Sequence, residues 1–160
     1  MERKPTKISI IGAGAVGAAC AFSIATQRLC AEIVIIDVNK EKAEGEAMDI
    51  SHGLITMGTM NIYSGDYSDI VDSDLIVITA GVGRKPGETL LDLANKNIAL
   101  ARDVTANIMK YYHRVSFIVV SNPVDLIPSP SPHETGPPIA PAFGPATQLA
   151  TLTLRLLLPA

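Results

Sequence analysis

The chain has 160 residues, of which 48% are hydrophobic and 18% are charged, and these values fit one ordinary domain with a substantial hydrophobic core. Its net charge is −3 and it has no cluster of Lys and Arg, so we expect neither a nucleic-acid partner nor an acidic membrane partner. No hydrophobic run approaches the length of a membrane span and no signal sequence precedes the first predicted strand, so we expect a soluble, cytoplasmic protein.

Strand and helix patterns alternate along most of the chain. β-Branched runs such as Ile33–Ile36 predict strands that are buried on both faces, and apolar residues spaced three and four apart predict helices. The predicted elements are a strand at 8–11, a helix at about 14–28, a strand at 32–37, a helix at 40–52 that stops at Gly53, a short strand at 60–63, a turn at 66–69, a strand at 75–81, a loop at 82–88, a helix at 89–112 and a strand at 115–120. This order predicts an α/β fold of the Rossmann type, which is a doubly wound parallel sheet covered by helices on both faces.

The composition changes near the C-terminus. Eight of the eleven prolines lie in residues 126–160, and prolines at alternate positions of 128–132 exclude a helix there because each lacks a backbone N–H and clashes with the preceding turn. We therefore predict one domain over 1–125, followed by a proline-rich segment. That segment is either disordered or ends in a short apolar helix at 147–158.

Cysteine and histidine positions give no sign of a metal site. Cys20 and Cys30 have no other Cys or His nearby at metal-ligand spacing, so we expect buried, reduced thiols. The histidines, His52, His113 and His133, are scattered and belong to no recognisable catalytic group. We expect them to be solvated or structural.

A glycine pattern connects the first predicted strand to the first predicted helix. Gly12, Gly14 and Gly17 form G-x-G-x-x-G, and Asp37 ends the second strand twenty residues later. In such a pattern the first glycine permits a tight turn, the second lets backbone approach a pyrophosphate, and the third lets the helix pack closely on the strand. The helix N-terminus offers free N–H groups to the phosphates, while Asp37 would accept hydrogen bonds from the adenosine ribose and repel a 2′-phosphate. The pattern favours NAD over NADP; the alternative is a glycine-rich turn that binds no nucleotide.

Six segments together resemble those of one enzyme family. They are Gly12–Gly17, Gly45–Gly53, Gly65–Tyr67, Thr79–Val82, Arg84–Thr89 and Ser121–Asp125. Over residues 7–125 the chain resembles the N-terminal, NAD-binding half of the L-lactate/malate dehydrogenase family, in particular bacterial L-lactate dehydrogenases. The resemblance implies NAD as cofactor, a small 2-hydroxy or 2-oxo acid as substrate, hydride transfer between the two, and a homo-oligomer.

The resemblance also implies roles for single residues. Besides the glycines, it places Val16, Asp37, Lys42, Tyr67, Gly81, Val82 and Asn122 in the NAD site. Arg84 and Asn122 would contact the substrate. In the resembling enzymes the position of Arg84 tends to hold Gln when the substrate is pyruvate and Arg when it is oxaloacetate, whose second carboxylate a guanidinium can pair with. Arg84 therefore favours malate while the rest resembles lactate dehydrogenases; the alternative is a solvated loop cation.

Three positions with catalytic or substrate-binding side chains in the family carry other residues here. Leu90 stands where an arginine polarises the reacting carbonyl, Ala150 where an acid orients the catalytic histidine, and Thr153 where an arginine binds the substrate carboxylate. Leucine cannot donate a hydrogen bond to a developing alkoxide. Arg155 matches an arginine that binds an allosteric sugar bisphosphate in some bacterial relatives, and the segment with the catalytic histidine would follow Ala160.

We therefore expect a truncated, degraded or erroneously recorded copy of a dehydrogenase, lacking the family's C-terminal catalytic domain. Such a chain would be a cofactor-binding half with little or no turnover alone. The first alternative is a non-catalytic module that binds a nucleotide or another subunit. The second is a chain that does not fold stably, because surfaces that a second domain would cover are exposed.

Overall fold

The computed structural model describes residues 6–54, 60–83, 85–111 and 115–120. Its elements, in chain order, are β1 (Lys7–Ile11), α1 (Ala15–Thr26), β2 (Glu32–Ile36), α2 (Lys40–Gly53), β3 (Asn61–Ser64), the 3-10 helix η1 (Tyr67–Ile70), β4 (Leu75–Ile78), α3 (Leu90–Met109) and β5 (Ser116–Val119). The segment predicted at 126–160, including its helix at 147–158, lies outside the described residues.

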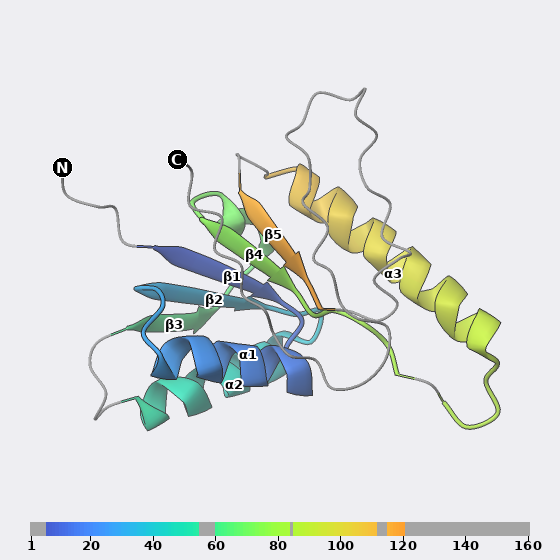
Figure 1. Cartoon of the computed structure of the whole chain (residues 1–160), viewed down its shortest axis with the longest axis horizontal. Coiled ribbons are helices and arrows are strands. Elements are labelled where there is room, and N and C mark those ends of the chain that lie inside the picture. Colours follow the sequence, from blue (N-terminus) through green and yellow to red (C-terminus); the bar gives the residue numbers. More distant parts are fainter. Residues whose placement is uncertain (1–5, 55–59, 84, 112–114, 121–160) are drawn as a thin grey trace.

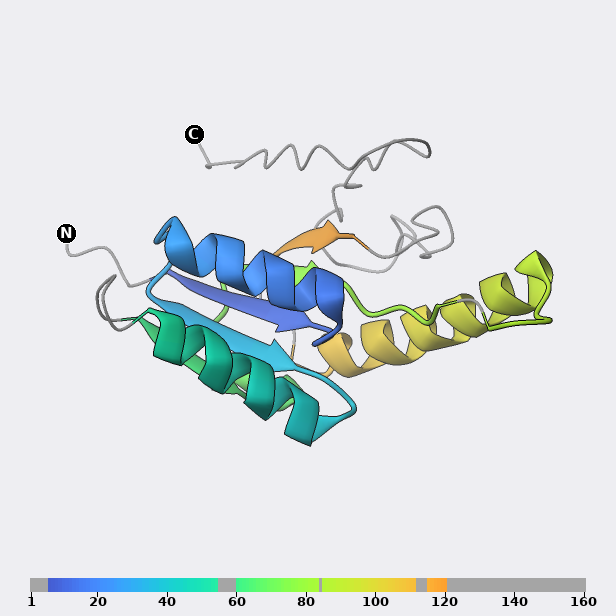
Figure 2. The same ribbon diagram turned by 90° about the horizontal axis from the view of Figure 1, so that it is seen from below.

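The five strands form one parallel sheet in the order β3-β2-β1-β4-β5. Helices α1 and α2 cover one face and α3 covers the other (Figure 1, Figure 2). The strand order changes direction at β1, because the chain moves outward from β1 to β2 and β3 and then returns to the other side of β1 with β4. This arrangement confirms the prediction of a Rossmann-type fold.

Two hydrophobic clusters hold the helices against the sheet, because successive strand residues point to opposite faces. The cluster under α1 and α2 contains the strand residues Ile8, Ile10, Ile33, Ile35 and Val77 with Ala21, Ile24, Ala25, Ala43, Ala47 and Ile50 of the helices. The cluster on the other face contains Ile11, Val34, Ile36, Ile76 and Ile78 with Ile70 of η1 and Val104 and Ile108 of α3. The buried residues of α3 belong to its C-terminal half, so packing on the sheet holds that half while its first turns extend past the sheet (Figure 2).

Some local predictions need correction. Gly53 was expected to stop the second helix, but α2 includes Gly53 and Leu54 is its C-cap, with φ −90° in the right-handed region. The helix therefore ends without the left-handed residue that would require glycine, and Leu54 is buried in the core. The turn predicted at 66–69 agrees with the structure, in which Asp66 precedes the 3-10 helix η1 and its N–H donates to Asp69 Oδ2 at 2.8 Å.

The burial of the cysteines and histidines agrees only in part with the predictions from the sequence. Cys30 is buried, and burial raises the pKa of its thiol to about 11. Cys20 is only half-buried on α1, contrary to expectation, although burial raises the pKa of its thiol as well. His52 is exposed in the last turn of α2, as expected for a solvated histidine, while His113 and His133 lie outside the described residues.

The described ranges contain neither a candidate metal site nor a helix that could span a membrane. Within them, His, Cys, Asp and Glu side chains do not gather in groups of three or more that could hold a metal ion. In the same ranges, each helix is too short or too polar to cross a membrane.

An ion-paired cluster joins the first residues of β1 and β2 to β3. The Lys7 ammonium lies 2.8 Å from Glu32 Oε1 and donates to the Tyr63 hydroxyl at 3.0 Å, and that hydroxyl donates to Glu32 Oε1 at 2.9 Å. The two charged side chains are 13% and 32% exposed. The hydrogen bond from Lys7 holds the pKa of Glu32 below its ordinary 4.5. Burial opposes the charge on Lys7, but its bonds to Glu32 and Tyr63 outweigh that effect and raise its pKa above 10.5.

We expect Glu32→Gln to lower the free energy of unfolding by about 1 kcal/mol at neutral pH, since the pair is partly buried. A lowered pKa in the folded state means that the carboxylate stabilises the fold above pH 4.5 and that this contribution disappears as the pH falls through the folded-state value. Urea unfolding of the original chain and of the Glu32→Gln variant, measured from neutral pH into acid, should therefore give free energies of unfolding that converge at low pH. A constant difference at all pH values would contradict this origin of the stability.

Candidate functional site

The glycine-rich turn between β1 and α1 is wedged between the carboxyl ends of β2 and β4. The Gly12 N–H donates to Ile36 O at 2.8 Å, and Thr79 Oγ1 donates to Gly12 O at 3.0 Å. Gly12 has φ +110°, and a Cβ there would lie 2.8 Å from Thr79 Oγ1 and 2.9 Å from the backbone N of Ala80. Both the backbone conformation and the space therefore require glycine at this position.

The other two glycines lie at the N-cap and in the first turn of α1. Gly14 is the N-cap, and among the described residues nothing lies within 4 Å of a Cβ built there. Gly17 is the opposite case: its Cβ would overlap the Gly12 carbonyl oxygen and lie 2.8 Å from Thr79 Oγ1. The three glycines thus have the geometry that the sequence predicts: a tight turn, an open approach, and close packing of helix on strand.

The N-terminus of α1 has no side chain as a cap. The N-caps of α2 and α3 are Asn39 and Thr89, and the side chain of each accepts a backbone hydrogen bond. In contrast, α1 has no side-chain cap bond and no acidic residue in its first turn. The first N–H groups of a helix need acceptors from outside. The start of α1 lies at the switch point of the sheet, beside the open space at Gly14.

Asp37, directly after β2, lies beside this turn. Its Oδ2 accepts from the Ala13 N–H at 2.6 Å and its Oδ1 accepts from the Asn39 N–H at 2.9 Å. The sequence predicted a ribose acceptor here, but it did not predict that the same carboxylate would bind the backbone of the glycine-rich turn. A carboxylate has about four acceptor positions, so both oxygens keep capacity for a ligand.

Three other predicted residues lie on α1, α2 and η1. Val16 is 50% exposed in the first turn of α1, and Lys42 is exposed in the first turn of α2. Tyr67 of η1 packs against the cluster under α3. Burial raises the pKa of the Tyr67 hydroxyl, and the carboxylates of Asp37 and Asp103 raise it further. Tyr67 thus lies on the side of the sheet that faces α3.

Gly81 and Val82 follow β4 at the same edge of the sheet and are exposed, Val82 to 46%. The backbone of Val82 is held by the side chain of Asn97 in α3, at 2.9 Å and 3.3 Å. Nothing in the sequence pattern singles out Asn97, since a polar residue within an amphipathic helix is ordinarily solvated.

The remaining predicted residues lie at the start of α3 or outside the described residues. Leu90 is the first residue of α3. The other positions, namely Arg84, Asn122, Ala150, Thr153 and Arg155, lie outside the described residues.

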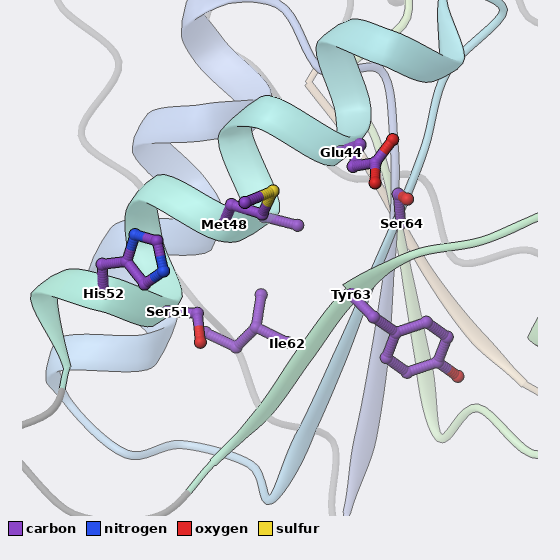
Figure 3. A pocket seen from close by; sticks show the side chains of 8 residues that line it. Glu44, Met48, Ser51, His52, Ile62, Tyr63 and Ser64 are labelled. Atoms are coloured by element: carbon purple, nitrogen blue, oxygen red, sulfur yellow. The ribbon is translucent and has the colours of Figure 1, made fainter.

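A cavity of about 240 Å³ lies elsewhere, between α2 and the edge strand β3. Figure 3 shows Glu44, Met48 and His52 of α2 on one side of it and Ile62 and Ser64 of β3 on the other. None of the residues that line it belongs to the predicted NAD site. The cavity therefore adds nothing to the candidate site at the carboxyl ends of the strands.

Comparison with known sequences agrees with this geometry. Residues 6–137 match the family model described as lactate/malate dehydrogenase, NAD binding domain. An L-lactate dehydrogenase of Clostridium perfringens is 44% identical over 158 residues, which are 99% of this chain and 50% of that enzyme. An L-lactate dehydrogenase of Clostridium botulinum is 46% identical over 154 residues, 96% of this chain and 48% of the relative. The chain thus spans about half the length of these relatives.

Solved structures agree as well. The L-lactate dehydrogenase of Clostridium thermocellum is 53% identical, with a TM-score of 0.65, over 76% of this chain and 38% of that one. The malate dehydrogenase of Archaeoglobus fulgidus, in complex with NADH, is 37% identical, with a TM-score of 0.72, over 76% of this chain and 42% of that one. With its five-stranded sheet and glycine-rich turn, this chain therefore belongs to the lactate/malate dehydrogenase family and corresponds to its NAD-binding domain.

Proposed function

We propose that this chain binds NAD(H) at the carboxyl edge of its sheet, as the cofactor half of an oxidoreductase of the L-lactate dehydrogenase type. The observation that carries the proposal is the uncapped N-terminus of α1, which faces open space above Gly14 with Asp37 beside it. Anionic phosphate groups are favoured acceptors for such a helix end.

Each part of the site has a separate task. The first N–H groups of α1 hold the pyrophosphate, and Gly14 leaves room for it. Asp37 accepts hydrogen bonds from the adenosine ribose hydroxyls while it keeps the turn in place through Ala13. Its negative charge repels a 2′-phosphate, so the site selects NAD over NADP. Val16, Lys42, Tyr67, Gly81, Val82 and Asn122 complete the site.

The substrate in this proposal is a small 2-hydroxy or 2-oxo acid, contacted by Arg84 and Asn122. When bound, NAD(H) would supply the hydride acceptor or donor for the hydroxyl-bearing carbon of such an acid. Leu90, Ala150 and Thr153 supply none of the charged groups that the reaction needs, so the chain alone has little or no turnover. Arg84 favours oxaloacetate as a second candidate substrate, since a guanidinium can pair with its extra carboxylate. A cytoplasmic homo-oligomer is part of the same proposal.

Titration with NADH tests the proposal directly. We expect saturable binding, seen as a change in NADH fluorescence, and weaker binding of NADPH. Pyruvate or oxaloacetate added to the NADH complex should leave its absorbance constant. Absence of NADH binding to the folded chain would contradict the proposed function. Turnover would contradict the assignment of Leu90, Ala150 and Thr153 as inactive replacements.

A further inference from the structure

Asn97 in α3 makes a two-way contact with the backbone of a single residue. Its Oδ1 accepts from the Val82 N–H at 2.9 Å, and its Nδ2 donates to the Val82 carbonyl oxygen at 3.3 Å. One side-chain amide thus pairs both polar backbone groups of Val82, as a neighbouring strand would. Asn97 itself is half-buried.

The adjacent residue of α3 holds the other end of the same loop. The Lys96 ammonium pairs with Glu88 Oε1, and Glu88 Oε2 accepts from the Lys85 N–H at 2.9 Å. Two successive helix residues therefore fix the segment that leaves β4 at both of its ends. The helix can do so because its first turns extend past the sheet, along this segment (Figure 1, Figure 2).

Val82 lies close to the candidate cofactor site along the chain. Thr79, three residues earlier, bonds to the carbonyl oxygens of Ile11 and Gly12, and Ala80 lies against Gly12. After β4 the backbone therefore passes the glycine-rich turn and then leads away from the carboxyl ends of β1 and β4. Glycines on both sides of Val82 leave this stretch flexible unless another group fixes it.

We propose that Asn97 is a positioning residue, which fixes the backbone of Gly81 and Val82 at the mouth of the NAD site. This inference rests on the proposed function. An asparagine suits the task because it supplies a donor and an acceptor together, whereas a carboxylate offers acceptors only. The clamp lowers the conformational entropy of the segment before the cofactor binds, so losing it costs affinity.

The test compares Asn97→Asp and Asn97→Ala with the unsubstituted chain. Asn97→Asp keeps the acceptor for the Val82 N–H but sets a carboxylate against the Val82 carbonyl oxygen. We expect the NADH dissociation constant to rise about tenfold in both variants, as for the loss of one or two hydrogen bonds. Backbone amide exchange should accelerate at Val82 and stay unchanged at residues 100–109 of α3. The matched control is Asn95→Ala, because Asn95 is an exposed asparagine of the same helix. This substitution should change neither the NADH dissociation constant nor the amide exchange at Val82.

The outcomes distinguish a failure of the proposed NADH binding from a failure of the positioning role of Asn97. If the unsubstituted chain binds no NADH, the proposed function fails and the role of Asn97 fails with it. If that chain binds NADH but the Asn97 variants bind equally well, only the positioning role is wrong. Faster exchange throughout α3 in the variants would also contradict it, because Asn97 would then support the helix rather than the segment.

Discussion

Replacing Gly17 by alanine is expected to lower the free energy of unfolding by roughly 3 kcal/mol and to abolish NADH binding. The added Cβ would overlap the carbonyl oxygen of Gly12 and lie 2.8 Å from Thr79 Oγ1. Backbone atoms cannot turn away as a flexible side chain can, so α1 would have to move off β1. That movement would carry the helix N-terminus away from the phosphate position. Urea unfolding and NADH titration measure the two effects.

Gly45→Ala is the matched control for this substitution. Gly45 lies inside α2, and among the described residues nothing lies within 4 Å of a Cβ built there. Alanine in a helix interior is favoured over glycine by roughly 0.5–1 kcal/mol, so this variant should be slightly more stable than the original chain and bind NADH equally well. Equal stability of the Gly17→Ala and Gly45→Ala variants would refute the close packing of α1 on β1.

Asp37→Asn is expected to weaken NADH binding by about 2 kcal/mol, or roughly 30-fold, which is typical of losing hydrogen bonds to a charged group. An amide offers one oxygen where the carboxylate offers two, and its NH2 group would face the N–H of Ala13 or of Asn39. The charge that repels a 2′-phosphate is also lost, so the preference for NADH over NADPH should narrow. Dissociation constants for both cofactors measure this change.

Asp49→Asn serves as the control for net charge, because Asp49 is exposed on α2 and outside the predicted NAD site. It should leave both dissociation constants unchanged. The assignment of Asp37 is wrong if its variant binds NADH as tightly as the Asp49 variant does.

The sequence was sufficient for those features that depend on local pattern. The β-branched runs around Ile10 and Ile35 read correctly as buried parallel strands, and the spacing of Gly12, Gly14 and Gly17 fixed the turn and its helix. The predicted end of α2 was wrong, because a glycine at position 53 permits a left-handed residue that ends the helix but does not require one. Local patterns state what a residue allows, and packing decides whether the chain uses it.

Contacts between distant segments could not be predicted in the same way. Asn97 and Val82 are fifteen residues apart, and their pairing depends on where the first turns of α3 lie relative to the end of β4. The bond between Asp37 and Ala13 depends likewise on β1 and β2 being neighbours in register. Both are bonds from a side chain to the backbone, which hydrophobic periodicity does not record.

The bond between Asp37 and Ala13 also bears on the kinetics of cofactor binding. Because it closes the turn through protein atoms alone, the proposed site would need little reorganisation to accept a dinucleotide. The conformational entropy lost on binding is then mostly that of the ligand. If NAD binds as proposed, we expect variants of this turn to differ mainly in the rate at which the cofactor is released.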